Sequence, residues 1–159
     1  MLSVSVFFNV TSLPDSIYEY TKDSLEHMVK EGAFPDLIQV GNEIINGMLW
    51  PVAKVDPLGM ENWDLFVKLL ESGAKACREI CPKAKIIIHT EKAGEWNKIK
   101  TYYNHLWQLD YDIIGLSYYS MWHKAVGVLA ATLDSLAIEF PDKEVMIVEA
   151  AAYLSLIHI

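Results

Sequence analysis

Two alternating patterns of hydrophobic residues run along this chain. Short runs dense in valine, isoleucine and leucine are typical of strands whose two faces are both covered. Between them, apolar residues recur every three to four positions, as on one face of a helix. The short runs predict strands at residues 36–41, 84–89, 111–117 and 144–149. The periodic stretches predict helices at residues 16–30, 61–80, 96–109 and 126–140.

This order of elements is that of an α/β protein with a parallel sheet, because each strand is joined to the next through a helix. Gly32, Pro82 and Pro141 follow three of the predicted helices and fit as helix stops. Two architectures remain open: a doubly wound open sheet, or a partial (β/α)8 (TIM) barrel in which these strands form half. No strand is followed by a glycine-rich phosphate loop, which weakens the first option. The irregular stretch at residues 45–60 is long enough to be a functional loop.

Chemically useful side chains follow all four predicted strands. In a parallel sheet covered by helices, the carboxyl ends of the strands meet at one edge and carry the chemistry. Each residue alone has an ordinary role as a helix cap or as core packing, but their convergence favours a sugar-cleaving cleft. Carboxylates supply acid/base and nucleophilic groups there, and aromatic rings stack on sugars. The residues at these four ends are Asn42 and Glu43, His89 with Glu91, Tyr118, Tyr119, Trp122 and His123, and Glu149.

Composition excludes several other classes of protein. Hydrophobic residues make up 52% and charged residues 21% of the chain, which is a globular balance. No apolar run reaches the ~20 residues of a membrane-spanning helix. The formal net charge of −8 without a basic patch argues against nucleic acid as a partner. Cys77 and Cys81 are expected to be small buried thiols, and they lack the histidines of a zinc site.

Four segments resemble the endo-β-1,4-galactanases (arabinogalactan endo-β-1,4-galactosidases). Residues 38–51, which read IQVGNEIINGMLWP, are similar to that family's acid/base strand and the loop after it. Residues 17–23 (IYEYTKD) resemble the helix before this strand. Residues 112–119 (DIIGLSYY) with Trp122 and His123, and residues 144–149 (EVMIVE), are similar to the sixth and seventh strands. The resemblance therefore implies a TIM barrel, of which the chain covers strands four to seven.

The resemblance also implies a reaction and roles for residues. The implied reaction is retaining hydrolysis of β-1,4-galactan, with Glu43 as acid/base and Glu149 as nucleophile. Asn42 is then expected to bind a sugar hydroxyl and Tyr118 or Tyr119 to support Glu149, a choice left open. The other expected substrate contacts are Trp50, His89, Trp122 and His123. No metal or other cofactor is expected, and the intact protein is expected outside the cytoplasm, extracellular or periplasmic.

The sequence departs from the family pattern beside the two glutamates rather than at them. Residues 150–153 read AAAY and lack an expected proline, and Ser120-Met121 stands where proline followed by an aromatic residue is common. The alternatives are another retaining barrel glycosidase acting on β-1,4-glucan or mannan, a carbohydrate-binding module without catalysis, and an inactive fragment. We expect residues 1–10 to be a spurious start, residues 11–153 to be the barrel segment, and residues 154–159 to be a sequencing-adapter tail. The oligomeric state is left open.

Overall fold

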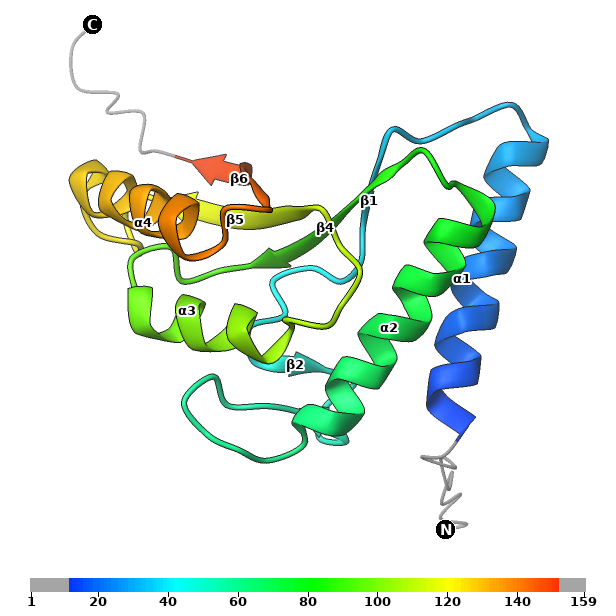
Figure 1. The fold of residues 1–159 in the computed structure, drawn as a ribbon, viewed down its shortest axis with the longest axis horizontal. Helices are drawn as coiled ribbons and strands as arrows, with labels where there is room; N and C mark the ends of the chain where they lie inside the picture. Colours follow the sequence, from blue (N-terminus) through cyan, green and yellow to red (C-terminus); the bar gives the residue numbers. More distant parts are fainter. Residues whose placement is uncertain (1–11, 152–159) are drawn as a thin grey trace, which may run out of the picture.

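A four-stranded parallel sheet, in the order β1-β4-β5-β6, forms the centre of the molecule (Figure 1). The computed structural model describes residues 12–151, so the expectations for residues 1–10 and 154–159 lie outside it. The strands are β1 (Leu37–Gln39), β4 (Lys85–Thr90), β5 (Ile113–Tyr119) and β6 (Glu144–Ala151). All four predicted strands are therefore confirmed, and the crossover between each pair holds a helix.

The four predicted helices are also present: α1 (Leu13–Lys30), α2 (Trp63–Ile80), α3 (Trp96–His105) and α4 (Val126–Glu139). Helices α1 and α2 pack side by side (Figure 1). The end of α1 shows why Gly32 stops it. Gly32 has φ +84°, and its N–H donates to Val29 O at 3.0 Å while Ala33 N–H donates to Met28 O at 2.9 Å. This pair of bonds needs a left-handed residue, which glycine adopts without steric cost.

The two faces of the sheet have different surroundings. Alternate side chains of a strand point to opposite faces. Ile86 and Ile88 of β4 and Ile114 and Leu116 of β5 are fully buried and join the core under the helices. The opposite face carries His89 and Ser117, which are also fully buried.

Gly115 lies on the same face as Ser117, because the two are separated by two positions in β5. A Cβ atom at Gly115 would stand 2.7 Å from Ile87 Cγ2 and 3.3 Å from Val148 Cγ1. The face opposite the helices is thus closely packed at this point, and only glycine fits there.

A β-bulge in β6 changes which face its last residues share. Leu116 pairs with Ile147, but the next residue, Ser117, pairs with Glu149, so Val148 is an extra residue in the ladder. A bulge of this kind re-aims the side chain that follows it. Without it Val148 would pair with Ser117, and Glu149 would turn toward the helices. The bulge therefore places Glu149 on the face that carries Ser117 and His89.

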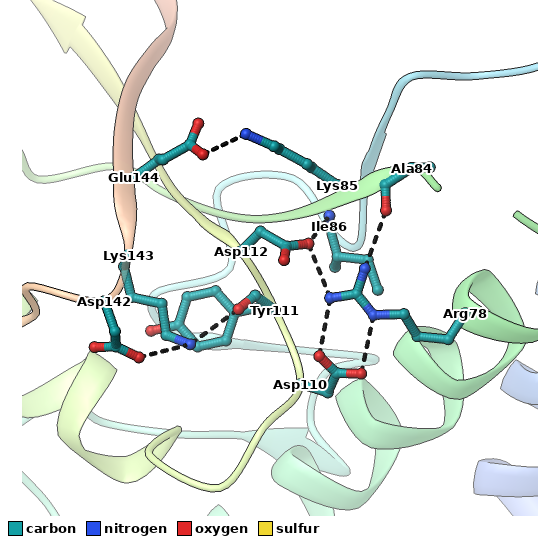
Figure 2. A network of polar contacts seen from close by, with 10 residues as sticks. All are labelled: Arg78, Ala84, Lys85, Ile86, Asp110, Tyr111, Asp112, Asp142, Lys143 and Glu144. Atoms are coloured by element: carbon teal, nitrogen blue, oxygen red, sulfur yellow. Dashed lines mark hydrogen bonds and ion pairs between the residues drawn. The ribbon is translucent and has the colours of Figure 1, made fainter. Parts of the chain in front are cut away.

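A polar network ties together the opposite, amino-terminal ends of the strands (Figure 2). Arg78 of α2 donates Nε–H and Nη2–H to the two oxygens of Asp110, each at 2.9 Å, and Nη1–H to Ala84 O at 3.0 Å. Asp112 accepts from Arg78 Nη2 at 2.8 Å and from the Ile86 N–H at 2.7 Å. The hydrogen bond to Asp110 raises the pKa of Arg78, and the same contact lowers the pKa of Asp110.

The long stretch after β1 contains a short antiparallel hairpin that the sequence pattern did not predict. Strand β2 (Gly47–Met48) pairs with β3 (Ala53–Lys54), two residues on each side. Two residues are too few to show the alternation by which a strand is predicted.

Cys77 and Cys81 are free, buried thiols as expected, and burial raises the pKa of Cys77 to about 11. Across residues 12–151, no helix combines the length and apolar character needed to cross a membrane.

Candidate active site

Glu43 occupies a left-handed turn directly after β1. Its φ is +49°, and Gly41 two positions earlier has φ +82°. A left-handed backbone costs a non-glycine residue about 1–2 kcal/mol, so neighbouring contacts must hold it. One such contact is the Ile44 N–H, which donates to His89 O at 3.1 Å. The Glu43 side chain is half-buried, and Ser117 Oγ donates to its Oε1 at 2.7 Å.

A chain of hydrogen bonds extends from Glu43 across the ends of three strands. His89 Nε2 lies 2.8 Å from Ser117 Oγ, and His89 Nδ1 lies 3.2 Å from Asn42 Oδ1. Because Ser117 gives its proton to Glu43, it accepts from His89 Nε2–H. Asn42 Oδ1 also accepts from Gln39 Nε2 at 3.0 Å. The chain therefore fixes Asn42, His89, Ser117 and Glu43 relative to one another.

The side chain of His89 is fully buried. Burial lowers the pKa of His89, while the negative charges of Glu149 and Glu43 oppose this effect. A neutral ring that donates from Nε2 leaves Nδ1 as an acceptor. Asn42 must then present Nδ2–H to His89, and the Gln39 amide must turn as well so that its oxygen accepts from Asn42 Nδ2. The oxygen and nitrogen of an amide are interchangeable in shape, which permits this exchange. His89 thus orients Ser117 and Asn42 together.

Glu149 reaches the same region from β6. Tyr119 OH donates to Glu149 Oε2 at 2.7 Å, and this hydrogen bond raises the pKa of Tyr119, so the phenol keeps its proton. Tyr118 points elsewhere and donates to Lys124 O at 3.0 Å. Of the two tyrosines that the sequence left open, Tyr119 is therefore the one that contacts Glu149.

Glu43 and Glu149 both lie near His89 and Tyr119. The charges of Glu43 and Glu149 both act on the ionisation of His89 and of Tyr119. Ser117 also connects them, because its hydroxyl bonds to Glu43 while its backbone pairs with Glu149. The structure therefore brings two carboxylates, each with its own hydroxyl donor, to one site at the carboxyl ends of the strands.

The remaining predicted residues lie around this centre in different settings. Trp122 is 73% exposed and its ring stands edge-on to Tyr119 at 5.7 Å. It borders a pocket of about 250 Å³ that Lys92 and Lys124 also line. Trp50 is 59% exposed beside the β2–β3 hairpin, and Lys54 Nζ lies 4.4 Å from its ring centre.

His123 has an internal contact rather than an open position. It is 8% exposed, and its Nδ1 accepts from the Tyr119 N–H at 3.1 Å. This bond holds the turn after β5 and thereby the backbone of Tyr119.

Two residues of the site had no role predicted for them: Ser117, which was noted only as a polar residue at the end of its strand, and Gln39. Ser117 contacts both His89 and Glu43, and Gln39 contacts Asn42. The alternation of side chains along β5 could have indicated Ser117, because Ser117 and Tyr119 lie on one face of the strand while Leu116 and Tyr118 lie on the other. Among residues 12–151 there is no cluster of three metal-binding side chains.

Comparison with known proteins supports the resemblance to the galactanases that the sequence indicated. The family model described as glycosyl hydrolase family 53 matches residues 6–156. The arabinogalactan endo-β-1,4-galactanase of Thermothelomyces thermophilus is 28% identical over 151 residues, covering 89% of this chain and 44% of that protein. A probable arabinogalactan endo-β-1,4-galactanase A of Aspergillus flavus is 31% identical over 155 residues, covering 89% of this chain and 42% of that protein.

Solved structures agree with the fold. The catalytic domain of a family 53 protein from Ignisphaera aggregans has a TM-score of 0.86 at 28% identity, covering 96% of this chain and 41% of that one. A fungal β-1,4-galactanase has a TM-score of 0.80 at 26% identity, covering 94% and 46%. The chain therefore spans less than half the length of these relatives, and its curled parallel sheet with alternating helices is part of a TIM barrel. On the extent of the family match, the chain belongs to glycosyl hydrolase family 53.

Proposed function

We propose that the protein carrying these residues hydrolyses β-1,4-galactosidic linkages in type I arabinogalactan and retains the configuration of the anomeric carbon. The observation that carries the proposal is the pairing of Glu43 with Ser117 and of Glu149 with Tyr119 around one centre. Retaining glycosidases in general use two carboxyl groups that lie about 5–5.5 Å apart, one as acid/base and one as nucleophile. The proposed substrate is taken from the names of the relatives, which are arabinogalactan endo-β-1,4-galactanases.

In the proposed reaction Glu149 attacks the anomeric carbon and forms a glycosyl-enzyme, while Glu43 protonates the leaving oxygen. Glu43 then removes a proton from the incoming water, which releases the sugar from Glu149. Tyr119 holds the Glu149 carboxylate in position, and Ser117 holds Glu43. Asn42 is exposed beside Glu43 and is placed to bind a sugar hydroxyl, and Trp122 offers a ring for stacking. A polymeric substrate of this size places the reaction outside the cytoplasm.

Release of reducing sugar from β-1,4-galactan, cellulose and mannan tests the proposal. Two proteins should be compared: the 159-residue chain, and a chimera in which residues 12–151 replace the matching segment of the Thermothelomyces thermophilus galactanase. We expect galactan to be the preferred substrate of the chimera, and the product to appear first as the β-anomer by NMR. Preference for cellulose or mannan would contradict the substrate, and an α-anomer appearing first would contradict the mechanism.

Variants of the two glutamates test the roles of the residues. Glu43→Ala and Glu149→Ala should each lower turnover by several orders of magnitude, on the order of 10⁴-fold or more. Glu26→Ala, an exposed glutamate on α1 far along the chain from the site, is the matched control. Azide should restore cleavage of an activated galactoside by Glu149→Ala and yield the α-glycosyl azide. Ordinary activity in Glu149→Ala would remove it as the nucleophile.

A further inference from the structure

Tyr119, the residue that contacts Glu149, ends a strand that has a neighbouring strand on one side only at that point. The pairing of β5 with β4 stops at Leu116, which lies opposite Thr90, while the pairing with β6 continues to Tyr119. The last residues of β5 therefore depend on contacts outside the sheet for part of their support.

Both backbone groups of Tyr119 bond to the turn that follows β5. Its carbonyl accepts from the N–H groups of Trp122, at 2.9 Å, and of His123, at 2.8 Å. Its N–H donates to Nδ1 of the His123 ring at 3.1 Å. His123 thus supplies two of these three hydrogen bonds, one from its backbone and one from its side chain.

The backbone around His123 is itself fixed by the loop after β4 and by Tyr118. A Cβ atom at Gly94 would stand 2.6 Å from His123 O, so the two segments are in close contact. The next residue, Lys124, has a left-handed backbone with φ +69° and is held there from both ends. Tyr118 OH donates to Lys124 O at 3.0 Å, and Lys124 Nζ donates to Gly94 O at 2.9 Å. The His123 ring, which is 8% exposed, is therefore anchored by more than its own contact with Tyr119.

We propose that His123 is a positioning residue for Tyr119, which it fixes through Nδ1 so that the phenol meets Glu149. The inference rests on the role proposed for Glu149 as nucleophile. Tyr119 OH donates to Glu149 Oε2 at 2.7 Å, and a shift of the Tyr119 backbone moves this hydroxyl with it. A displacement of about 1 Å would take the two oxygens past the range of a hydrogen bond. His123 acts on the reaction only through this contact.

A direct contact with substrate is the alternative role for His123, because the residue also lines the pocket of about 250 Å³ beside Trp122. The two roles use different ring nitrogens. Positioning needs an acceptor at Nδ1, whereas a substrate contact needs Nε2, because Nδ1 already accepts from the Tyr119 N–H. The side-chain amide of asparagine lies near the position of Nδ1, and that of glutamine near the position of Nε2. His123→Asn and His123→Gln therefore separate the two roles.

The first experiment reads the hydrogen bond without catalysis. In NMR spectra of the ¹⁵N-labelled 159-residue chain, a scalar coupling across the N–H···N bond should connect the Tyr119 amide nitrogen with His123 Nδ1. Tyr118→Phe leaves both atoms of this bond in place and is the matched control, in which the coupling should persist. Absence of the coupling from the unaltered chain would overturn the proposal, whatever the activity of the protein.

The second experiment reads the consequence for the reaction. In the chimera, His123→Leu should lower kcat by roughly tenfold to a hundredfold, the range expected for a small displacement of a catalytic group. KM should change by no more than about twofold, because no contact with substrate is lost. His123→Asn should recover most of kcat, and His123→Gln should resemble His123→Leu. Recovery by glutamine rather than asparagine, or a loss that lies mainly in KM, would assign His123 to substrate binding and overturn the positioning role.

A double substitution tests whether His123 acts through Tyr119. In Tyr119→Phe the hydroxyl that contacts Glu149 is gone, so adding His123→Leu should lower kcat by at most about threefold more. An undiminished loss in the double variant would show general damage to the turn and overturn the proposal. A chimera that cleaves no galactan with all of these residues in place would instead contradict the proposed function, and the coupling in the first experiment would still stand.

Discussion

At the scale of single residues, the site depends on which of the two neighbouring tyrosines, Tyr118 or Tyr119, lies on the face of β5 that carries Ser117. Tyr118 and Tyr119 are chemically identical, and composition cannot separate them. The structure separates them by alternation: Tyr119 shares a face with Ser117 and bonds to Glu149, and Tyr118 turns to the carbonyl of Lys124. Glu43, Asn42, His89 and Glu149 were predicted from their places after strands, and the structure brings them together. Their hydrogen-bond partners were not predicted, because a serine or a glutamine has many ordinary positions.

Removal of one hydroxyl tests this assignment. Tyr119→Phe takes away the donor to Glu149 and should lower kcat by about 10–10³-fold, the range for a donor to a reacting group. Tyr118→Phe removes the same atom one position earlier and loses only the bond to the Lys124 carbonyl. It is expected to lower the melting temperature more than kcat. Steady-state kinetics with paired thermal melts would decide, and the reverse pattern would contradict the assignment.

The buried histidine predicts how stability depends on pH. Burial lowers the pKa of His89 in the folded chain, so the unfolded chain binds the proton more readily. The stabilisation is therefore fully present above the unfolded value of about 6.5 and is lost as the pH falls through the lower folded value. Urea denaturation between about pH 7.5 and 4.5 should show this decline, and His89→Gln should flatten part of it. An unchanged slope in that variant would assign the decline to other groups.

At the scale of elements, the order of helices and strands follows directly from the sequence, but two features do not. The β2–β3 hairpin is too short to show a period, and the bulge at Val148 leaves no trace in composition. Strands are predicted from apolar runs and from alternation with a period of two, and neither pattern distinguishes the extra residue of a bulge from a regular residue. The bulge is nevertheless what turns Glu149 to the face that carries the site.

Two glycines on different elements should respond oppositely to an added methyl group. Gly115→Ala in β5 would put a Cβ atom 2.7 Å from Ile87 Cγ2, so we expect a loss of about 1–3 kcal/mol in the free energy of unfolding. Gly127→Ala at the start of α4 meets no atom within 4 Å and should gain up to about 1 kcal/mol. Chemical denaturation of both variants measures the difference, and a neutral Gly115→Ala would mean that β4 and β5 are not closely packed there.

At the scale of the whole molecule, the two ends of the sheet carry different kinds of residues. The carboxyl ends of the strands carry Glu43 and Glu149, and the amino ends carry the network around Arg78 (Figure 2). This separation is typical of barrel enzymes, in which one end is devoted to chemistry and the other to stability. Sequence patterns predict the chemical end, because its residues are clustered by type. They do not predict the Arg78 network, whose members are ordinary charged residues spread over 34 positions.

The Arg78 network should contribute to stability without contributing to turnover. Arg78→Met removes donors to the Ala84 carbonyl and to Asp112, and about 1–2 kcal/mol of the free energy of unfolding should be lost. The exposed carboxylate of Asp110 adds little after solvent screening. Lys85→Ala breaks the exposed pair with Glu144 and is the matched control, with an expected change within about 0.5 kcal/mol. Urea denaturation measures both, and equal effects would contradict this ranking.

The bulge at Val148 means that the position of Glu149, the proposed nucleophile, depends on a residue with no chemistry of its own. If the bulge closed while Val148 stayed in the chain, every side chain of the candidate site would still be present. Val148 would then pair with Ser117, and Glu149 would turn from the face that carries the site to the face covered by the helices. The register of β6 is thus as much a determinant of the proposed activity as the identity of Glu149.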